Sequence, residues 1–240
     1  LRGQRTSLRS SGSALMEIIA EVTPVRDRTK LLKKLEALKP LVNRIDIPEA
    51  PGGKPTAHAL AVGALAKQMG FEPIVHIRLL DVNKTGLKSL LGGAYLLDIK
   101  DVVVLQGDPP AEGRPVGEVS TEEAVEEAKK MGLRAGALLS LRRDHRKRVE
   151  TLRADFYLAL HLTDAKQLEG LPPIVYPYVM VRTSNNSELI DRLRQTAVEP
   201  HEALALVEAL EGTAPGAVIS VPGDFDALVG LLKQIKTRRG

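Results

Sequence analysis

Cysteine and tryptophan are absent from the 240-residue sequence, and aromatic residues make up only 3% of it. Because cysteine is absent, the chain cannot form a disulfide, a thiolate nucleophile, a cysteine-ligated iron–sulfur cluster or a cysteine-based zinc site. We expect no metal centre. The few, scattered aromatic side chains argue against a base-stacking surface for nucleic acid. No apolar run approaches the roughly 18 residues of a membrane helix, and the basic start lacks the apolar segment of a signal peptide. We therefore expect a cytoplasmic protein that binds neither nucleic acid nor a membrane.

The residues that are present can build a large core, but their charge is unevenly placed. Hydrophobic residues make up 43% of the chain, and the net charge is +4. Basic side chains crowd one segment, which holds Arg142, Arg143, His145, Arg146, Lys147 and Arg148. Because this segment directly follows a predicted strand, it could bind a phosphorylated small molecule. The alternative is a solvated helix face.

Strand and helix patterns alternate along almost the whole chain. Short apolar runs bounded by turn residues predict eight strands, at 17–23, 42–47, 73–79, the start of 101–110, 134–141, 155–161, 174–181 and 216–221. Helical spacing of apolar residues predicts helices at 28–39, 56–69, 84–97, 120–131, 187–195, 201–211 and 224–237, with short helical segments on either side of 155–161. This order predicts a single-domain (β/α)8 TIM barrel over residues 16–240, after an N-terminal extension and helix at 1–15. An open doubly wound sheet is the alternative, but the sequence has no GxGxxG or GxxxxGK phosphate loop.

Polar residues at the carboxyl ends of the predicted strands are the candidates for a site, because these ends meet at one mouth of a barrel. They are Glu21, Asp46, His76, Arg78, Gln106, Asp108, His161 and Asp224. The segment 101–110, DVVVLQGDPP, shows this arrangement: the pattern of a buried strand is followed by a polar turn that carries a carboxylate. Structural alternatives remain open: Glu21 could pair with Arg78, and His76 could be a core residue. Asp108 could simply cap its turn.

Three segments resemble the methylenetetrahydrofolate reductase family, whose members are flavoprotein barrels. Residues 72–110 resemble three successive elements of the family. These are a strand that ends in a His-Leu-Thr-like segment, a helix with the pattern Gly-Leu-x-Ser-x-Leu-x-Gly-Ala, and a strand that ends in Gly-Asp-Pro. Residues 20–26, AEVTPVR, are similar to the family's first strand with its Glu and following Pro, and residues 45–70 to the second strand and loop of one branch. The segments occur in the family's order, and all lie in the first half of this chain.

The resemblance implies that a methylene-tetrahydropterin, either 5,10-methylenetetrahydrofolate or a methanopterin-type analogue, is reduced to its methyl form by flavin-mediated hydride transfer. Opening the five-membered ring requires a proton on a ring nitrogen and then a hydride on the resulting iminium carbon. Glu21 would be the general acid, because a carboxyl group buried at the mouth can keep its proton near neutral pH. By resemblance, Asp108 would hydrogen-bond the pterin and favour the cationic iminium. His161 is the polar residue nearest the family's folate-contacting position.

The resemblance also implies FAD as the cofactor and NAD(P)H as a possible reductant. The cofactor contacts would come from Asp46, His76, Gln106, Gly107, Asp144, Arg146 and Lys147. Gln106 stands where FAD-binding relatives have Arg, and Asp46 stands where they have Thr. The loop after the strand at 134–141 is also shorter than in those relatives. A different flavin, a deazaflavin or no tightly held flavin are therefore open alternatives.

A second hypothesis is a pterin-binding barrel subunit that has no flavin of its own. Such a subunit would be active only with an electron-transfer partner protein. We expect a homo-oligomer that binds a small-molecule reduced pterin under either hypothesis.

Overall fold

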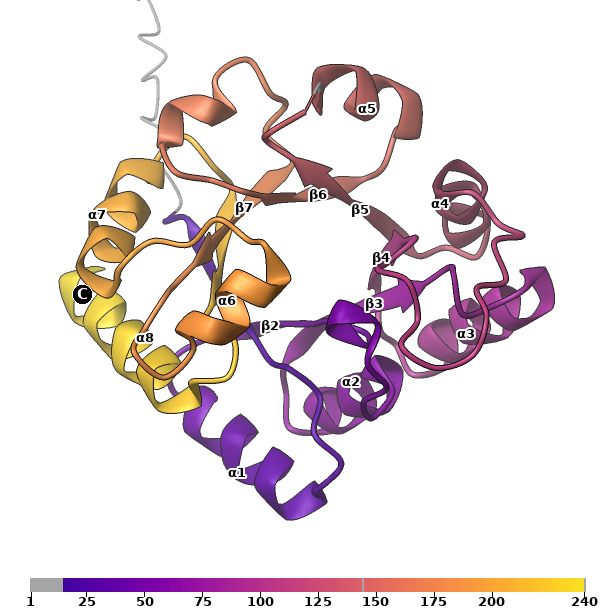
Figure 1. Ribbon diagram of the computed structural model, residues 1–240, viewed down its shortest axis with the longest axis horizontal. Helices are drawn as coiled ribbons and strands as arrows, with labels where there is room; N and C mark the ends of the chain where they lie inside the picture. The colour runs from indigo at the N-terminus through magenta and orange to yellow at the C-terminus, as the bar shows by residue number, and fades with distance from the viewer. Residues whose placement is uncertain (1–14, 144, 240) are drawn as a thin grey trace, which may run out of the picture.

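The computed structural model describes residues 15–143 and 145–239, in which eight parallel strands close into a barrel (Figure 1). Each strand is hydrogen-bonded to the next in chain order, and the last strand closes onto the first. The strands are β1 (Glu17–Glu21), β2 (Arg44–Ile47), β3 (Glu72–Arg78), β4 (Asp101–Leu105), β5 (Arg134–Ser140), β6 (Phe156–Leu160), β7 (Val175–Met180) and β8 (Gly216–Ser220). The predicted TIM barrel is confirmed. The predicted N-terminal extension and helix lies, apart from residue 15, outside the described residues.

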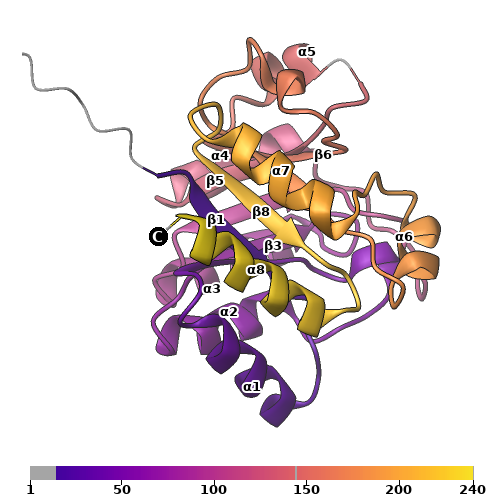
Figure 2. The ribbon, with the colours of Figure 1, turned by 90° about the vertical axis from the view of Figure 1, so that its left-hand side faces the viewer.

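The helices surround the barrel and connect successive strands, except between β6 and β7, where there is only a single short turn. They are α1 (Arg28–Leu38), α2 (Ala59–Gln68), α3 (Lys84–Leu96), α4 (Thr121–Lys130), α5 (His145–Leu152), α6 (Ser187–Leu193), α7 (Pro200–Leu210) and α8 (Phe225–Arg239), with single turns η1 (Pro51–Gly53) and η2 (Ala165–Leu168). Figure 2 views the barrel from the side where β1 and β8 pair, with α8 in front of them. Within the described part of the chain, the helices are too short or too polar to cross a bilayer.

Local signals fix most of the helix boundaries. The hydroxyl of Ser120 accepts a hydrogen bond from the backbone N–H of Glu123, whose carboxylate accepts one from the backbone of Ser120 in return, so Ser120 caps the start of α4. The prediction that a helix begins at residue 56 is wrong by three residues. Helix α2 begins at Ala59 because the imidazole of His58 accepts the N–H of Leu60 and caps this end.

The inside of the barrel is filled by side chains that alternate with the outward-facing ones along each strand. The buried inner cluster consists of Ile19, Ile74, Val103, Phe156, Leu158, Tyr178 and Val218. A second, larger cluster lies between the outer faces of the strands and the helices. Because the lumen is packed in this way, small molecules can approach the interior only from an end of the barrel.

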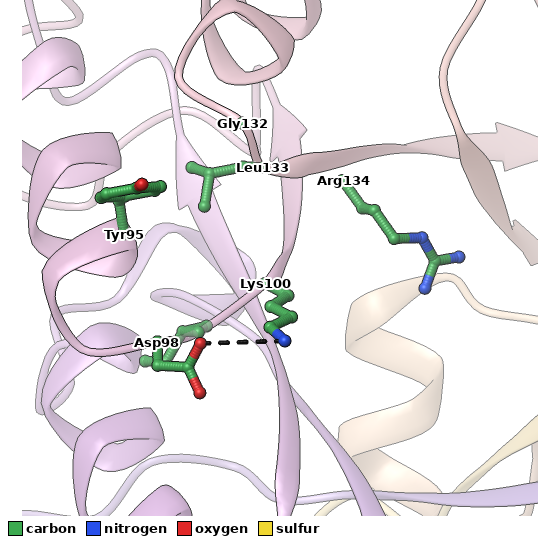
Figure 3. A pocket seen from close by; sticks show the side chains of 7 residues that line it. Tyr95, Asp98, Lys100, Gly132, Leu133 and Arg134 are labelled. Atoms are coloured by element: carbon green, nitrogen blue, oxygen red, sulfur yellow. Dashed lines mark ion pairs between the residues drawn. The ribbon is translucent and has the colours of Figure 1, made fainter.

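Ion pairs close the end of the barrel where the strands begin. Arg44 Nη1 lies 3.2 Å from Glu17 Oε2, and Asp101 pairs with both Arg44 and Arg134. A pocket of about 450 Å³ lies beside this end and is lined by Tyr95, Asp98, Ile99, Lys100, Gly132, Leu133 and Arg134. Figure 3 shows Asp98 paired with Lys100, while the guanidinium of Arg134 points away from both. The predicted site residues are at the opposite end.

Candidate functional site

The carboxyl ends of β1, β2, β3, β7 and β8 bring five polar side chains together inside the mouth of the barrel. Glu21 and Asp46 occupy paired positions on β1 and β2. His76 comes from β3, Tyr178 from β7 and Ser220 from β8. All five are linked by hydrogen bonds or lie within electrostatic range of one another. Three of the predicted strand-end residues therefore belong to one cluster.

Asp46 is the centre of a buried hydrogen-bonded network. Its Oδ1 lies 2.8 Å from His76 Nε2, and its Oδ2 accepts a hydrogen bond from the hydroxyl of Tyr178. None of the surface of Asp46 is exposed, and His76 and Tyr178 are each 4% exposed. The predictions that Asp46 and His76 contact a cofactor stay untested. A direct contact with Asp46 would require this network to open.

Glu21 differs from Asp46 because it is only partly buried. Its Oε1 accepts a 2.8 Å hydrogen bond from the hydroxyl of Ser220, and Ser220 itself is fully buried. Burial, followed by the nearby charge of Asp46, raises the pKa of Glu21 to about 7, although Ser220 and His76 act in the opposite direction. A carboxyl group with such a pKa can hold and release a proton near neutral pH.

The imidazole of His76 and the phenol of Tyr178 both respond to Asp46. Burial lowers the pKa of His76, but the charge and hydrogen bond of Asp46 and the charge of Glu21 outweigh this effect, so its pKa is raised overall. Burial, with Asp46 and Glu21 next in order, holds the pKa of Tyr178 well above its usual value. Tyr178 is therefore a neutral hydrogen-bond donor at neutral pH.

Arg78 anchors the loops around the mouth and does not pair with Glu21. Its guanidinium forms an ion pair with Asp81, in which Nε lies 2.6 Å from Oδ2, so the alternative partner for Glu21 is wrong. It also donates to the backbone carbonyls of Ala50, at 3.2 Å, and Asp108, at 2.9 Å. The segments after β2, β3 and β4 are therefore held by one buried side chain.

Replacing Arg78 with Lys should weaken this anchor and lower the stability of the protein. One ammonium cannot reach Asp81 and two carbonyl oxygens at the same time, so we expect a loss of about 2–3 kcal/mol in the free energy of unfolding. Chemical denaturation measures the loss, and amide hydrogen exchange should increase in residues 48–58 and 106–119. Arg238→Lys is the matched control, because Arg238 pairs with Glu208 at the surface and the same change there should cost less than about 0.5 kcal/mol. Equal effects of the two changes would contradict the anchoring role.

In the polar turn after β4, Gln106 and Gly107 contact other parts of the protein, whereas Asp108 is exposed. Gln106 donates a 3.0 Å hydrogen bond to the carbonyl of Val119, and Gly107 has a φ of +86°. A Cβ on Gly107 would lie 2.9 Å from Arg78 Nη1, so glycine is needed both for the backbone conformation and for space. Asp108 is exposed, and its carboxylate has no hydrogen bond or ion pair with the described residues. Its predicted contact with a pterin stays a prediction.

The opposite side of the mouth, above β5 and β6, carries the basic segment. A pocket of about 550 Å³ lies there, lined by Glu122, Leu138, Leu139, Ser140, Arg143, His145, Lys147, Arg148, Thr151 and Leu160. Arg148 also donates to the carbonyl of Leu138, and Arg146 donates to the carbonyl of Glu169. Lys147 lines this pocket, whereas Arg146 is not among its lining residues, and Asp144 lies outside the described residues. The predicted cofactor contacts of these residues stay predictions.

His161 stands at the end of β6 in a left-handed backbone conformation, with a φ of +70°. The hydroxyl of Thr196 lies 3.3 Å from its Nδ1, and its side chain is only partly buried. Burial, with the charges of Arg142 and Arg143 next, lowers the pKa of His161, which keeps the imidazole neutral. A neutral imidazole could exchange hydrogen bonds with a ligand, so its predicted substrate contact stays open.

Asp224, another strand-end candidate, has a structural role. Its Oδ2 accepts hydrogen bonds from Thr183 and Asn185, at 2.8 and 3.0 Å, and its Oδ1 accepts the N–H of Ala227 in the first turn of α8. Asp224 therefore caps a helix and ties it to the loop after β7.

Sequence reasoning missed Tyr178 and Ser220. Both lie on the inner face of their strands near the carboxyl ends, where an alternating pattern would have placed them. Tyr178 lies two residues after Tyr176, and Ser220 is the last residue of β8. A search for polar side chains at every second strand position would have identified both.

Comparisons with known proteins support the fold and leave the family open. No protein-family profile and no curated protein sequence matches the chain. Among solved structures, an uncharacterized protein from Clostridium thermocellum that binds two copies of 5-methyl-5,6,7,8-tetrahydrofolic acid is 11% identical, with a TM-score of 0.68 over 94% of this chain and 97% of that one. Tryptophan synthase from M. tuberculosis is 12% identical, with a TM-score of 0.60 over 93% and 92%. The spore cortex-lytic enzyme SleL of Bacillus cereus is 10% identical, with a TM-score of 0.55 over 92% and 74%. At these identities, the likeness shows that the chain has a TIM-barrel fold.

Proposed function

We propose that this protein binds a reduced pterin at the mouth of the barrel and reduces a methylene group carried by it to a methyl group, with Glu21 as the general acid. The observation that carries this proposal is the carboxyl group of Glu21. It lies partly exposed at the mouth, is held by Ser220 and has a pKa of about 7. A carboxylic acid of this kind can donate a proton to a basic ring nitrogen at neutral pH.

Two steps account for the bonds that change. Glu21 gives its proton to the ring nitrogen that binds the methylene carbon, and the C–N bond of the five-membered ring breaks to leave an iminium. A hydride then adds to the iminium carbon and completes the methyl group. The carboxylate left on Glu21 remains hydrogen-bonded to Ser220 and regains a proton from water. The exposed carboxylate of Asp108 would lie where it could favour the cationic iminium by its charge.

The phosphate-bearing part of a flavin would bind in the pocket above β5 and β6, because that pocket combines basic and apolar side chains. Arg143, Lys147 and Arg148 would hold the phosphates, and Leu138 and Leu160 would contact the rest. When bound, a flavin supplies the hydride. The chain's own residues hold the pterin, provide the proton and limit the access of water.

A different observation favours the second hypothesis, a pterin-binding subunit that works with an electron-transfer partner. Asp46 and His76 are buried and bonded to each other, and Gln106 donates to the carbonyl of Val119. Three of the predicted flavin contacts thus already have partners within the protein. This function would retain Glu21 as the proton donor and obtain the hydride or electrons from another protein.

Two further observations support the pterin as ligand. The Clostridium thermocellum protein, which has the same fold over almost the full length of both chains, binds 5-methyltetrahydrofolic acid. Segments 20–26, 45–70 and 72–110, which resemble the reductase family, supply Glu21, Asp46, His76 and Asp108 at the same mouth.

Titration of the purified protein with 5-methyltetrahydrofolate by calorimetry tests the proposal. We expect saturable binding at one site per barrel mouth, and we expect Asp108→Asn to weaken it by about 10- to 100-fold, because a hydrogen bond to a charged group contributes about 1.5–3 kcal/mol. Tyr95→Ala is the control, because Tyr95 is 65% exposed at the other end of the barrel. Absence of binding, with and without added FAD, would contradict the pterin. Binding by a colourless protein that takes up no flavin would favour the partner-dependent subunit.

A further inference from the structure

The carboxyl groups of Glu21 and Asp46 are neighbours inside the barrel. Parallel pairing places the two residues opposite each other on β1 and β2, and both side chains point into the lumen, where they bond to Ser220 and Tyr178. Two carboxylates at adjacent buried positions cannot both be ionised without a large electrostatic cost. The pair is therefore more stable when one of the two carboxyl groups holds a proton.

Their hydrogen-bond partners decide which group is protonated. Asp46 accepts one hydrogen bond on each oxygen, from His76 and from Tyr178, and it has no exposed surface. Glu21 accepts a single hydrogen bond, from Ser220, on one oxygen. Donors on both oxygens stabilise an anion more than one donor does, and a cationic imidazole adds its charge. The arrangement therefore favours the negative charge on Asp46 and the proton on Glu21.

We propose that Asp46 is a positioning residue that keeps Glu21 protonated at neutral pH, with Tyr178 and His76 holding Asp46 as a buried anion. This inference rests on the proposed role of Glu21 as the proton donor. With His76 protonated, Asp46 ionised and both Glu21 and Tyr178 neutral, the four groups have no net charge, which is the state that costs least in a buried site.

The charged groups around the cluster agree with this distribution. Asp46 and His76 face Glu21 with opposite charges, and the effect of Asp46, which raises the pKa of Glu21, is the larger of the two. Burial lowers the pKa of His76, but the acidic groups around it, Glu49 among them, raise it overall, and the charge and hydrogen bond of Asp46 have the largest effect of these. The acidic neighbours thus keep His76 cationic, and this cation in turn helps to hold Asp46 as the anion.

The arrangement also affects the proton after its transfer. Once Glu21 has given up its proton, two carboxylates face each other across β1 and β2. Repulsion by Asp46 raises the free energy of the Glu21 anion, so Glu21 is a weaker acid than it would be without Asp46 and readily takes up a proton again after each transfer. Asp46 acts on the reaction through Glu21, because it has no surface with which to touch a substrate.

The protonation state can be measured in the ligand-free, full-length protein by NMR of ¹³C-labelled glutamate carboxyl groups, with the Glu21 signal assigned by its loss in Glu21→Gln. The midpoint should lie near the pKa of about 7 in the original protein. Removing the like charge should lower it by about 1 unit or more in Asp46→Asn. Tyr178→Phe should lower it less, because the Asp46 anion loses a donor. Ser220→Ala should raise the midpoint, because Glu21 itself loses a donor.

These opposite directions separate an electrostatic role from a structural one. An unchanged Glu21 midpoint in Asp46→Asn overturns the proposal. A higher Glu21 midpoint in Tyr178→Phe also overturns it, and this second variant provides the test if Asp46→Asn does not fold. Because no ligand is present, this outcome is independent of whether the protein binds or reduces a pterin. A failure of the proposed function would instead appear as absent pterin binding with the carboxyl titrations as expected.

The pH profile of the reaction gives a second measurement. A general acid works in its protonated form, so kcat/KM, whose pH dependence reports the free protein, should fall as the pH rises through the pKa of Glu21, about 7. In Asp46→Asn the decline of kcat/KM should move to lower pH by the same shift as the NMR midpoint. A loss of kcat by the same factor at every pH would indicate a structural defect and overturn the proposal.

Discussion

Glu21→Gln should lower the rate of methylene reduction by about 10²- to 10⁴-fold, the usual contribution of a positioned general acid. Glutamine has nearly the same shape as glutamic acid, and its amide oxygen can still accept the hydrogen bond from Ser220. The variant has no acidic proton, so the C–N bond of the pterin ring cannot be opened by transfer from this position. Binding of 5-methyltetrahydrofolate should remain within a few-fold of the original value.

Single-turnover kinetics can separate the two halves of this reaction. If the protein holds a flavin, NAD(P)H should reduce it at the same rate in Glu21→Gln as in the original protein, and only the transfer to the methylene-pterin should be slow. Without a bound flavin, the same comparison is made with a chemical or protein electron donor in place of NAD(P)H. Equal loss in both half-reactions would remove Glu21 from the role of acid.

Glu17→Gln is the matched control for this variant. Glu17 lies on the same strand and faces the same lumen, but at the other end, where it pairs with Arg44. Its side chain is 37% exposed, so the change should have little effect on stability or rate. A similar loss of activity in both variants would mean that the strand, and not the carboxyl group at the mouth, is required.

The fold could be predicted from the sequence because its signals are local. Each of the eight strands lies within two residues of its predicted bounds, since a short apolar run with turn residues at both ends specifies a buried parallel strand. The closure of the barrel then follows from the number and order of the strands. The same logic placed Glu21, Asp46 and His76 at one mouth, because the carboxyl ends of parallel strands converge.

The partners of these residues could not be predicted in the same way, because they are distant in the sequence. Tyr178 lies 132 positions from Asp46, and Ser220 lies 199 positions from Glu21. Which side chains meet across the lumen depends on strand stagger and on the depth of each residue, and neither quantity is visible in a local pattern. Arg78 illustrates the converse error, since its ionic partner is Asp81, three residues away, and not the more distant Glu21.

The conformation of the loops also could not be predicted from the sequence. Gln106, Gly107 and Asp108 are consecutive, yet one bonds to Val119, one makes room for Arg78 and one is exposed. These different contacts depend on the conformation of residues 106–119, and this segment has no periodic pattern in the sequence. The sequence therefore predicted a polar turn at this end of β4, but not the contact that each of its residues makes.

Gly136→Ala should destabilise the protein by about 2–3 kcal/mol, because it overpacks the inside of the barrel. Gly136 pairs with Phe156 across β5 and β6, and a Cβ added to it would lie 2.4 Å from two carbons of the Phe156 ring. The ring has little freedom to move. It packs edge-on against Tyr176, with centroids 6.3 Å apart, and the guanidinium of Arg134 lies 5.3 Å from its centre.

Thermal and chemical unfolding measure this effect, and the expected fall in Tm is about 4–12 °C for a domain of this size. Gly92→Ala is the control, because Gly92 lies exposed on α3 with nothing within 4 Å of an added Cβ, and alanine there should stabilise the helix by about 0.5–1 kcal/mol. The double variant Gly136→Ala/Phe156→Leu should recover part of the loss, because the smaller side chain removes the clash. If Phe156→Leu gives no such recovery, the destabilisation comes from the backbone of β5, and the barrel interior is less tightly packed around Phe156 than the distances indicate.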